Sequence, residues 1–204
     1  MLTAESYDYF MRLKIAQAGE AVLRQQAREL SRDELLSPET HQLIEWMRET
    51  MRDAPGVGLA APQVGLGLQL AVIEDSAEAQ RSIAPERLEE RGRRPVPFHV
   101  IVNPVLTLEG PPVEFFEGCL SATGFSALVP RSLRARVECL NEKGEPVSIA
   151  AEGWYARILQ HEIDHLHGTL YLDRMHSRSF VTVDNLTRHW NDLPIREVKQ
   201  RLGI

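Results

Sequence analysis

Residues 160–168 read QHEIDHLHG, and this stretch contains the pattern H-E-x-x-H. It falls at the end of a predicted helix at 153–167. On a helix, His161 and His165 lie one turn apart on the same face, near enough to hold one metal ion. Glu162 is rotated by about 100 degrees, where it can reach a water beside the metal. The alternative is a solvated helix face that matches the pattern by chance, so the rest of the sequence must decide.

The two histidines need a further ligand, because a catalytic zinc-type site usually takes three from the protein. A metzincin would have a third histidine where Tyr171 stands, and a thermolysin-type site needs a downstream glutamate, of which the first is Glu197. Upstream, the motif EGCLS at 117–121 contains Cys119, whose thiolate would complete the set. The alternative is that Cys119 is a small buried hydrophobic residue, as we expect for Cys139.

The glycine-rich stretch GVGLAAPQ at 56–63 formally matches the dinucleotide fingerprint G-x-G-x-x-A. That fingerprint must follow a strand and open a helix, whereas a predicted helix and Pro55 precede this stretch and Pro62 interrupts it. We therefore reject nucleotide binding and expect a loop. Its glycines let the backbone approach a ligand closely, and it ends in the uncharged donor Gln63.

The composition excludes several classes of protein. The chain has 204 residues, which favours a single domain, and 29 acidic against 23 basic side chains give a net charge of -6. This balance favours neither DNA nor an anionic membrane as a partner. No run approaches the roughly 18 apolar residues of a membrane span, and the opening MLTAESYDYF lacks the features of a secretory signal. A cytoplasmic protein is expected.

Helix and strand signals follow one another without regular alternation. Ser37 and Pro38 are typical of the start of a helix, which should end before the glycine-rich loop. Strand signals fall at 68–74, 99–109, 133–140 and 145–151. The second is interrupted at Pro104, the last two flank a hairpin turn, and the charged segment 75–97 is expected to be a surface excursion. We predict an α+β fold of mainly antiparallel sheets packed around a central helix carrying H-E-x-x-H, with N- and C-terminal helices.

Three motifs occur in the order GVGLAAPQ, EGCLS and QHEIDH, and together they resemble the signature motifs of the peptide deformylases. Their co-occurrence is far more specific than any one of them. The resemblance covers about residues 13–180, and it leaves a C-terminal helical extension at about 183–204 of a single catalytic domain, 1–204. The flanking ALVPR and GWYARILQHE are most similar to the mitochondrial, organellar-type branch. Because no transit peptide is visible, we expect a bacterial member of that branch.

The resemblance implies a metal-dependent hydrolase that removes the formyl group from N-formylmethionyl ends of nascent peptides and releases formate. Cys119, His161 and His165 would hold one divalent metal ion. Fe²⁺ is the ion that the family prefers, and Zn²⁺, Ni²⁺ or Co²⁺ can replace it. Glu162 would take a proton from the attacking water and deliver it to the leaving amine.

The resemblance also assigns the residues around the reacting group. The side-chain amide of Gln63 and the backbone N–H of Leu120 would donate to the oxyanion. The backbone of an extended peptide would pair with Val57, Gly58 and Gly118. The methionine pocket would be lined by Trp154 and Ile158. The last two are equally compatible with the core face of the helix. Arg157 and Ser126 differ from the better-known bacterial members, which affects the expected shape of the pocket and its peptide contacts.

The surroundings of the site carry further expectations. Glu117 and Arg131 are expected to form an ion pair that steadies the cysteine loop, and Asp164 is either an orienting group or an outward-facing acid. We expect a monomer or homodimer that meets its nascent-peptide substrate at the ribosome, with no DNA or membrane partner. The alternative function is a zincin-like metallopeptidase, which would share H-E-x-x-H but cleave internal peptide bonds.

Overall fold

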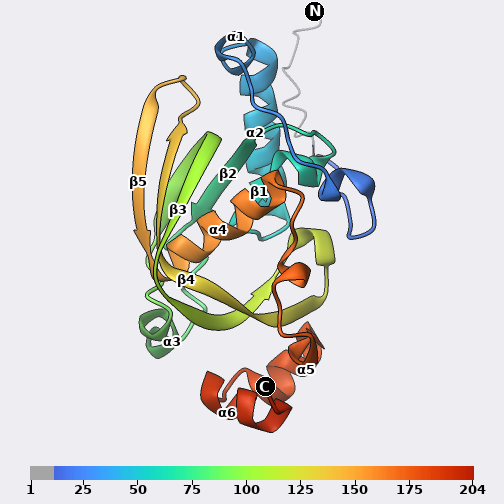
Figure 1. Ribbon diagram of the computed structural model, residues 1–204, viewed down its shortest axis with the longest axis vertical. Helices are drawn as coiled ribbons and strands as arrows, with labels where there is room; N and C mark the ends of the chain where they lie inside the picture. Colours follow the sequence, from blue (N-terminus) through green and yellow to red (C-terminus); the bar gives the residue numbers. More distant parts are fainter. Residues whose placement is uncertain (1–11) are drawn as a thin grey trace, which may run out of the picture.

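A computed structural model describes residues 12–204 and has an α+β architecture (Figure 1). The helices are α1 (Arg32–Leu35), α2 (Pro38–Asp53), α3 (Pro85–Glu90), α4 (Gly153–Leu166), α5 (Val183–Asn185) and α6 (Ile195–Leu202). The strands are β1 (Gly58–Ala60), β2 (Leu70–Asp75), β3 (Val96–Gly118), β4 (Phe125–Leu140), β5 (Pro146–Glu152) and β6 (Val181–Thr182). The prediction about a secretory signal concerns the first ten residues and lies outside the described part of the chain.

All the described strands belong to one antiparallel sheet. Its order is β1-β2-β3-β4-β5, and β6 pairs with the start of β4. The predicted α+β class with antiparallel pairing is therefore confirmed. The hairpin between β4 and β5 also forms as predicted, and the side chain of Asn141 closes its turn by accepting a hydrogen bond from the backbone N–H of Glu145 at 2.9 Å.

The predicted interruption at Pro104 is a bulge within β3 and not a strand end. Proline has no N–H to give to the ladder, and the register with β4 shifts between Val102 and Val105. Asn103 adopts a positive φ of 49° here, and its side chain makes two hydrogen bonds, of 3.0 and 2.9 Å, with the backbone of Leu30. The bulge lets β3 continue without a break to the cysteine motif.

Helix α2 begins as predicted, with the hydroxyl of Ser37 accepting a hydrogen bond from the N–H of Thr40 at 3.2 Å. Its buried face includes Ile44, Met47 and Met51, and it packs against apolar residues of β1, β2 and β3. The glycine-rich stretch that follows was expected to be a loop. Instead it forms β1, which pairs with β2, and then a short 3-10 helix at Ala61–Val64.

Helix α4 contacts β4 and β1 and crosses the strands in Figure 1. Ile158, Leu159 and Ile163 belong to its buried apolar face. The helix ends because Gly168 turns with a φ of 70°, and a Cβ there would lie 2.7 Å from the backbone of Arg24. This geometry places the H-E-x-x-H residues beside β1 and the end of β3.

The C-terminal segment is helical, as expected, although it is broken into α5, a π-helical turn at Leu186–Trp190, and α6. In Figure 1 this segment lies at the end of the molecule opposite α1. None of the helices in the described residues is long and apolar enough to cross a membrane.

Candidate metal centre

The three predicted metal ligands come together in the structure. The ligand atoms of Cys119, His161 and His165 all lie within 4.8 Å of one another. The sulfur of Cys119, directly after β3, is 3.3 Å from Nε2 of His165 on α4. The two imidazole rings have centroids 5.0 Å apart. Cys139, by contrast, is buried in the hydrophobic core, as its strand position indicated.

The electrostatics of this cluster fit a divalent cation. Burial lowers the pKa of His165 well below its ordinary value, which favours the neutral form that binds metals. Burial alone would also lower the pKa of His161, but the nearby Cys119 and Glu117 outweigh it and raise that pKa. Burial opposes ionisation of Glu117, but His161 and Arg131 outweigh it and lower the pKa of that carboxyl, so Glu117 adds negative charge beside the ligands. One sulfur and two nitrogens suit Zn²⁺ and other transition metals, so the residues present fit such an ion.

Glu162 lies beside this cluster with its carboxylate almost fully buried. It is 4 % exposed, and burial raises its pKa to about 7. Its Oε2 has no hydrogen-bond partner among the described residues. A buried polar atom without a partner is rare and needs an explanation. A carboxylate of this kind at the wall of a cavity is suited to accept a proton from a water or a substrate.

Gln63 presents its amide nitrogen to the same site. Its Oε1 accepts the backbone N–H of Ala60 at 2.9 Å, which fixes the orientation of the amide. The Nε2 group therefore faces the sulfur of Cys119 at 3.5 Å and the hydroxyl of Ser121 at 3.2 Å. Leu120 follows the cysteine and lines the same cavity. The site thus offers a fixed N–H donor next to the ligand cluster.

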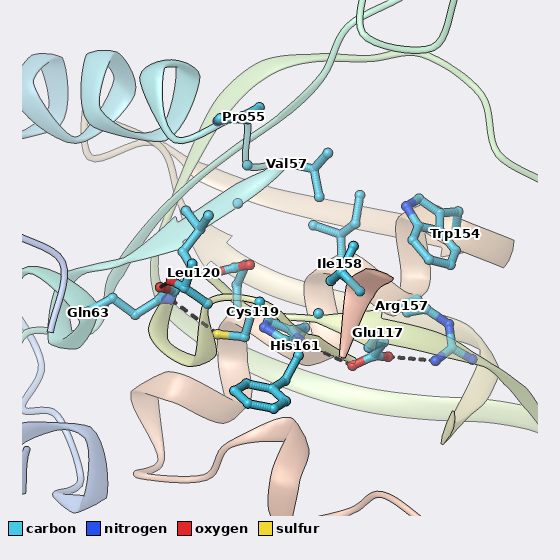
Figure 2. Close-up of a pocket in the computed structure, with 18 of the residues that line it drawn as sticks. Pro55, Val57, Gln63, Glu117, Cys119, Leu120, Trp154, Arg157, Ile158 and His161 are labelled. Carbon is cyan, nitrogen blue, oxygen red and sulfur yellow. Dashed lines mark hydrogen bonds and ion pairs between the residues drawn. The ribbon is translucent and has the colours of Figure 1, made fainter. Parts of the chain in front are cut away.

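A cavity of about 350 Å³ opens beside the ligands and Glu162 (Figure 2). The five residues predicted to contact substrate all line it: Val57, Gly58, Gly118, Trp154 and Ile158. Trp154 and Ile158 also pack against the hydrophobic core, so the two interpretations of these residues are compatible. Of the predicted ligands, Cys119 and His161 line this cavity, whereas His165 is 1 % exposed and lies behind them.

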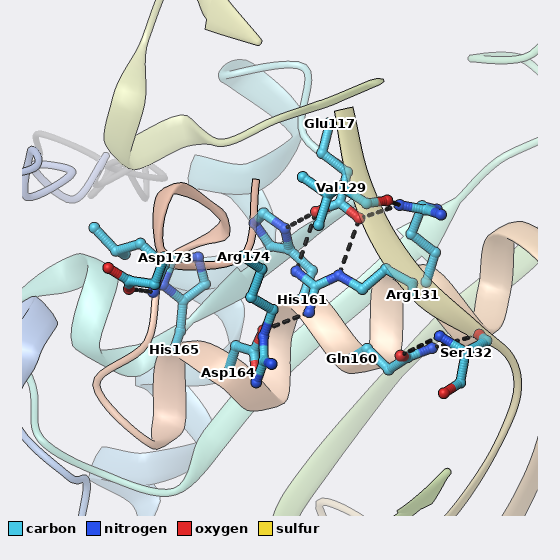
Figure 3. A network of polar contacts seen from close by, with 12 residues as sticks. Glu117, Val129, Arg131, Ser132, Gln160, His161, Asp164, His165, Asp173 and Arg174 are labelled. Carbon is cyan, nitrogen blue, oxygen red and sulfur yellow. Dashed lines mark hydrogen bonds and ion pairs between the residues drawn. The ribbon is translucent and has the colours of Figure 1, made fainter. Parts of the chain in front are cut away.

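A network of buried charges supports the ligands (Figure 3). The expected ion pair of Glu117 and Arg131 is present, with N–O distances of 3.0 and 3.1 Å. Oε2 of Glu117, which accepts the longer of these two bonds, also faces Nδ1 of His161 at 3.0 Å. Asp164 is 6 % exposed and pairs with Arg131 and Arg174, so the outward-facing alternative for Asp164 is wrong. A carboxylate that meets the Nδ1 atom of a metal-binding imidazole, as Glu117 meets that of His161, sets the orientation and tautomer of the ring.

Two arginines line the cavity: Arg157 was expected to affect the shape of the pocket, although its bond to Glu117 was not predicted, and Arg93 was missed. Arg93 comes from the charged segment expected to be a surface excursion, yet it binds the fully buried Asp75 through bonds of 2.8 and 2.9 Å. Arg157 is 2 % exposed and binds Glu117. The spacing of Arg157, one helical turn before His161, was a usable signal, because residues four apart share a face. No sequence signal linked Arg93 to the site.

A cluster of one thiol and two imidazoles beside a buried carboxylate, on an antiparallel α+β scaffold, is typical of a metal-dependent hydrolase. Residues 12–180 match the family model described as polypeptide deformylase, and the chain belongs to that family.

Individual relatives agree with this assignment. The chain is 44% identical over 191 residues to "Peptide deformylase 1A, chloroplastic" of Solanum lycopersicum, covering 93% of this chain and 67% of the relative. It is 46% identical over 194 residues to "Peptide deformylase 3" of Streptomyces avermitilis, covering 94% and 84%. Among solved structures, a Met-Ala-Ser-bound class I type b peptide deformylase from Acinetobacter baumannii matches with a TM-score of 0.72 and 32% identity, covering 81% of this chain and 99% of that one. The metallopeptidase alternative is not favoured.

Proposed function

We propose that this chain hydrolyses the formyl amide at the N-terminal formylmethionine of new polypeptides, releasing formate and a free amino terminus. The observation that carries the proposal is the buried carboxylate of Glu162, whose Oε2 has no hydrogen-bond partner within residues 12–204, beside the cluster of Cys119, His161 and His165. Membership of the family and the similarity to a deformylase that binds the peptide Met-Ala-Ser support it.

In this proposal α4 is the central, metal-carrying helix, and Cys119, His161 and His165 would hold one divalent cation. The Lewis acidity of that cation would lower the pKa of the attacking water. We propose Fe²⁺ as the native ion because it is the ion that the family prefers, with Zn²⁺, Ni²⁺ and Co²⁺ as substitutes. One thiolate and two imidazoles are compatible with all four ions and do not choose among them.

The protein groups move the protons. Glu162 accepts a proton from the water as its oxygen attacks the formyl carbon. The carbonyl oxygen becomes an oxyanion, which accepts hydrogen bonds from Nε2 of Gln63 and the backbone N–H of Leu120. When the carbon–nitrogen bond breaks, Glu162 returns the proton to the amine nitrogen, so that the products are formate and the amino terminus.

Substrate binding uses the walls of the cavity. The extended peptide pairs with the backbone at Val57, Gly58 and Gly118, and the methionine side chain lies between Trp154 and Ile158. The cavity suits an apolar side chain here because Trp154 and Ile158 line it together with Val57 and Leu120. We further propose a single catalytic domain in the cytoplasm, a monomer or homodimer, acting on nascent chains at the ribosome.

A comparison of two substrates tests the proposal. We expect the wild-type protein to release formate from formyl-Met-Ala and to leave an unformylated peptide of the same sequence intact. Cleavage confined to unformylated peptides would instead support the metallopeptidase alternative. Glu162→Gln should keep its metal while turnover falls by at least about a hundredfold, because general catalysis is lost. Parallel anaerobic Fe²⁺ and Zn²⁺ preparations test the choice of metal, and a less active Fe²⁺ form would count against iron.

A further inference from the structure

Arg157 is a buried cation that the proposed reaction does not use. It is 2 % exposed on α4, and an arginine is rarely buried unless its donors are bonded. Its Nη1 donates to Oε1 of Glu117 at 2.5 Å and to the carbonyl of Val129 at 2.9 Å, and its Nη2 donates to the carbonyl of Val113 at 2.7 Å. Arg157 therefore ties α4 to both β3 and β4.

The carboxylate of Glu117 is shared unequally between its neighbours. Its Oε1 accepts from Arg157 and from Nε of Arg131, the latter at 3.0 Å. Its Oε2 accepts from Nη2 of Arg131 at 3.1 Å and faces Nδ1 of His161 at 3.0 Å. Arg131 also bonds Asp164, so it is shared between two acids, whereas Glu117 is the only carboxylate bonded to Arg157 among the described residues. Arg157 thus restrains the side of Glu117 that turns away from His161.

Arg157 and Glu117 each lie close in sequence to a proposed metal ligand, so the bond between them affects the ligands. Arg157 and His161 lie one turn apart on α4, and Glu117 lies two residues before Cys119 on β3. A carboxylate held at Nδ1 of His161 favours the tautomer in which Nε2 is free to bind. The link from Arg157 through Glu117 to His161 therefore joins the strand that carries the sulfur to the helix that carries the nitrogens.

We propose that Arg157 is a positioning residue that, by clamping Glu117, keeps His161 in the tautomer and orientation that bind the metal. The inference rests on the proposed metal site. The alternative is that Arg157 only helps to form the wall of the substrate cavity, which we call a wall role. Its guanidinium also lies 5.3 Å from the ring centroid of Phe115 and 5.8 Å from that of Trp154. A wall role would alter substrate affinity but not the retention of metal.

Release of Zn²⁺ from the loaded protein into excess chelator separates the two roles without any assay of activity. Arg157→Met keeps an unbranched stem of similar reach, and we expect it to lose Zn²⁺ at least about tenfold faster than the wild type, as for other groups that orient metal ligands. Arg157→Lys keeps the charge and should fall between them. Arg174→Met is the control, because Arg174 binds Asp164 at 2.6 Å and has no hydrogen bond to Glu117 or to a metal ligand within residues 12–204. It should release Zn²⁺ at the wild-type rate.

The Co²⁺-loaded proteins give a second readout. The absorption bands of Co²⁺ depend on its ligands, so they should change in Arg157→Met and not in Arg174→Met. Wild-type release and wild-type bands in a folded Arg157→Met protein would overturn the proposal. If that variant does not fold, Arg157→Lys decides by the same measurements, with wild-type values again overturning it. A wild-type protein that holds Zn²⁺ but does not deformylate formyl-Met-Ala would refute the proposed function and leave this inference standing.

Discussion

The replacement Gly58→Ala should displace the proposed general base without removing any catalytic group. A Cβ at Gly58 would lie 2.2 Å from Oε1, 2.4 Å from Cδ and 2.7 Å from Cγ of Glu162. Ordinary non-bonded contacts between heavy atoms are about 3.5 Å or longer, so the carboxylate must move by about 1 Å or more. The backbone of Gly58 cannot easily yield, because β1 is paired with β2 at this position. The strain therefore falls on the side chain of Glu162.

The expected cost is mainly kinetic. A displacement of about 1 Å in a catalytic group lowers turnover by about a hundredfold, and overpacking of a buried site costs about 1–3 kcal/mol of the free energy of unfolding. We would measure kcat and KM for formyl-Met-Ala, the metal content and the thermal unfolding of the variant. The loss should appear in kcat, because the backbone groups that pair with the peptide are retained.

Gly67→Ala is the control for this experiment, because a Cβ at Gly67 meets nothing within 4 Å. It should leave kcat and KM at the wild-type values. The reasoning would be refuted by a folded, metal-loaded Gly58→Ala protein whose kcat remains within about threefold of the wild type. A loss in Gly67→Ala as large as that in Gly58→Ala would also refute it.

Four further changes test other parts of the site and core. Burial raises the pKa of Glu162 to about 7, a bound cation would lower it, and the carboxylate acts as a base only when it is ionised. The value of kcat/KM should therefore fall about tenfold per pH unit below a midpoint at or under pH 7. A midpoint well above pH 7 would contradict the assignment of Glu162 as the general base. Gln63→Ala should lower kcat by about a hundredfold or more at unchanged metal content, and an equal loss confined to KM would exclude oxyanion stabilisation. His165→Ala should abolish stoichiometric metal binding, measured by elemental analysis; a full complement of metal would remove His165 from the ligand set. Met47→Ala, at a fully buried position of α2, should lower the free energy of unfolding in urea by about 2–5 kcal/mol, and a change below about 1 kcal/mol would mean that the core closes over the gap.

The elements that local signals define could be predicted from the sequence. The capping of α2 by Ser37, the hairpin turn at Asn141 and the hydrogen bonds that end α4 at His167 all join residues a few positions apart, although Gly168 also lies close to the distant backbone of Arg24. The course of β3 past Pro104 could not be predicted, because the bulge depends on the backbone of Leu30, which is distant in sequence. For the same reason β1 was expected to be a loop, since its three residues become a strand only by pairing with β2.

In the candidate site, too, some features could be predicted from the sequence and others could not. Helical spacing alone predicted that His161 and His165 share a face. The approach of Cys119 was predicted because the two histidines need a third ligand and the downstream candidates fail, and then from the resemblance of three motifs, not from any local rule. Arg93 was missed because its partner, Asp75, lies at the other end of a segment that reads as a charged surface. A pair of opposite charges across such a segment carries no sequence signal that distinguishes it from solvated neighbours.

The position of Arg157 on its helix could be predicted from the sequence, but its burial could not. The rule that places His165 one turn after His161 places Arg157 one turn before it, so its position on the ligand face was available from spacing alone. Its burial was not, because an isolated arginine on an apolar face is costly and the hydrophobic pattern therefore directs it to solvent. The buried guanidinium is bonded by the carboxylate of Glu117, brought from β3 to 2.5 Å, and by the carbonyls of Val113 and Val129. A charged residue on the buried face of a helix, one turn from a metal ligand, therefore indicates that an opposite charge comes from another element to meet it.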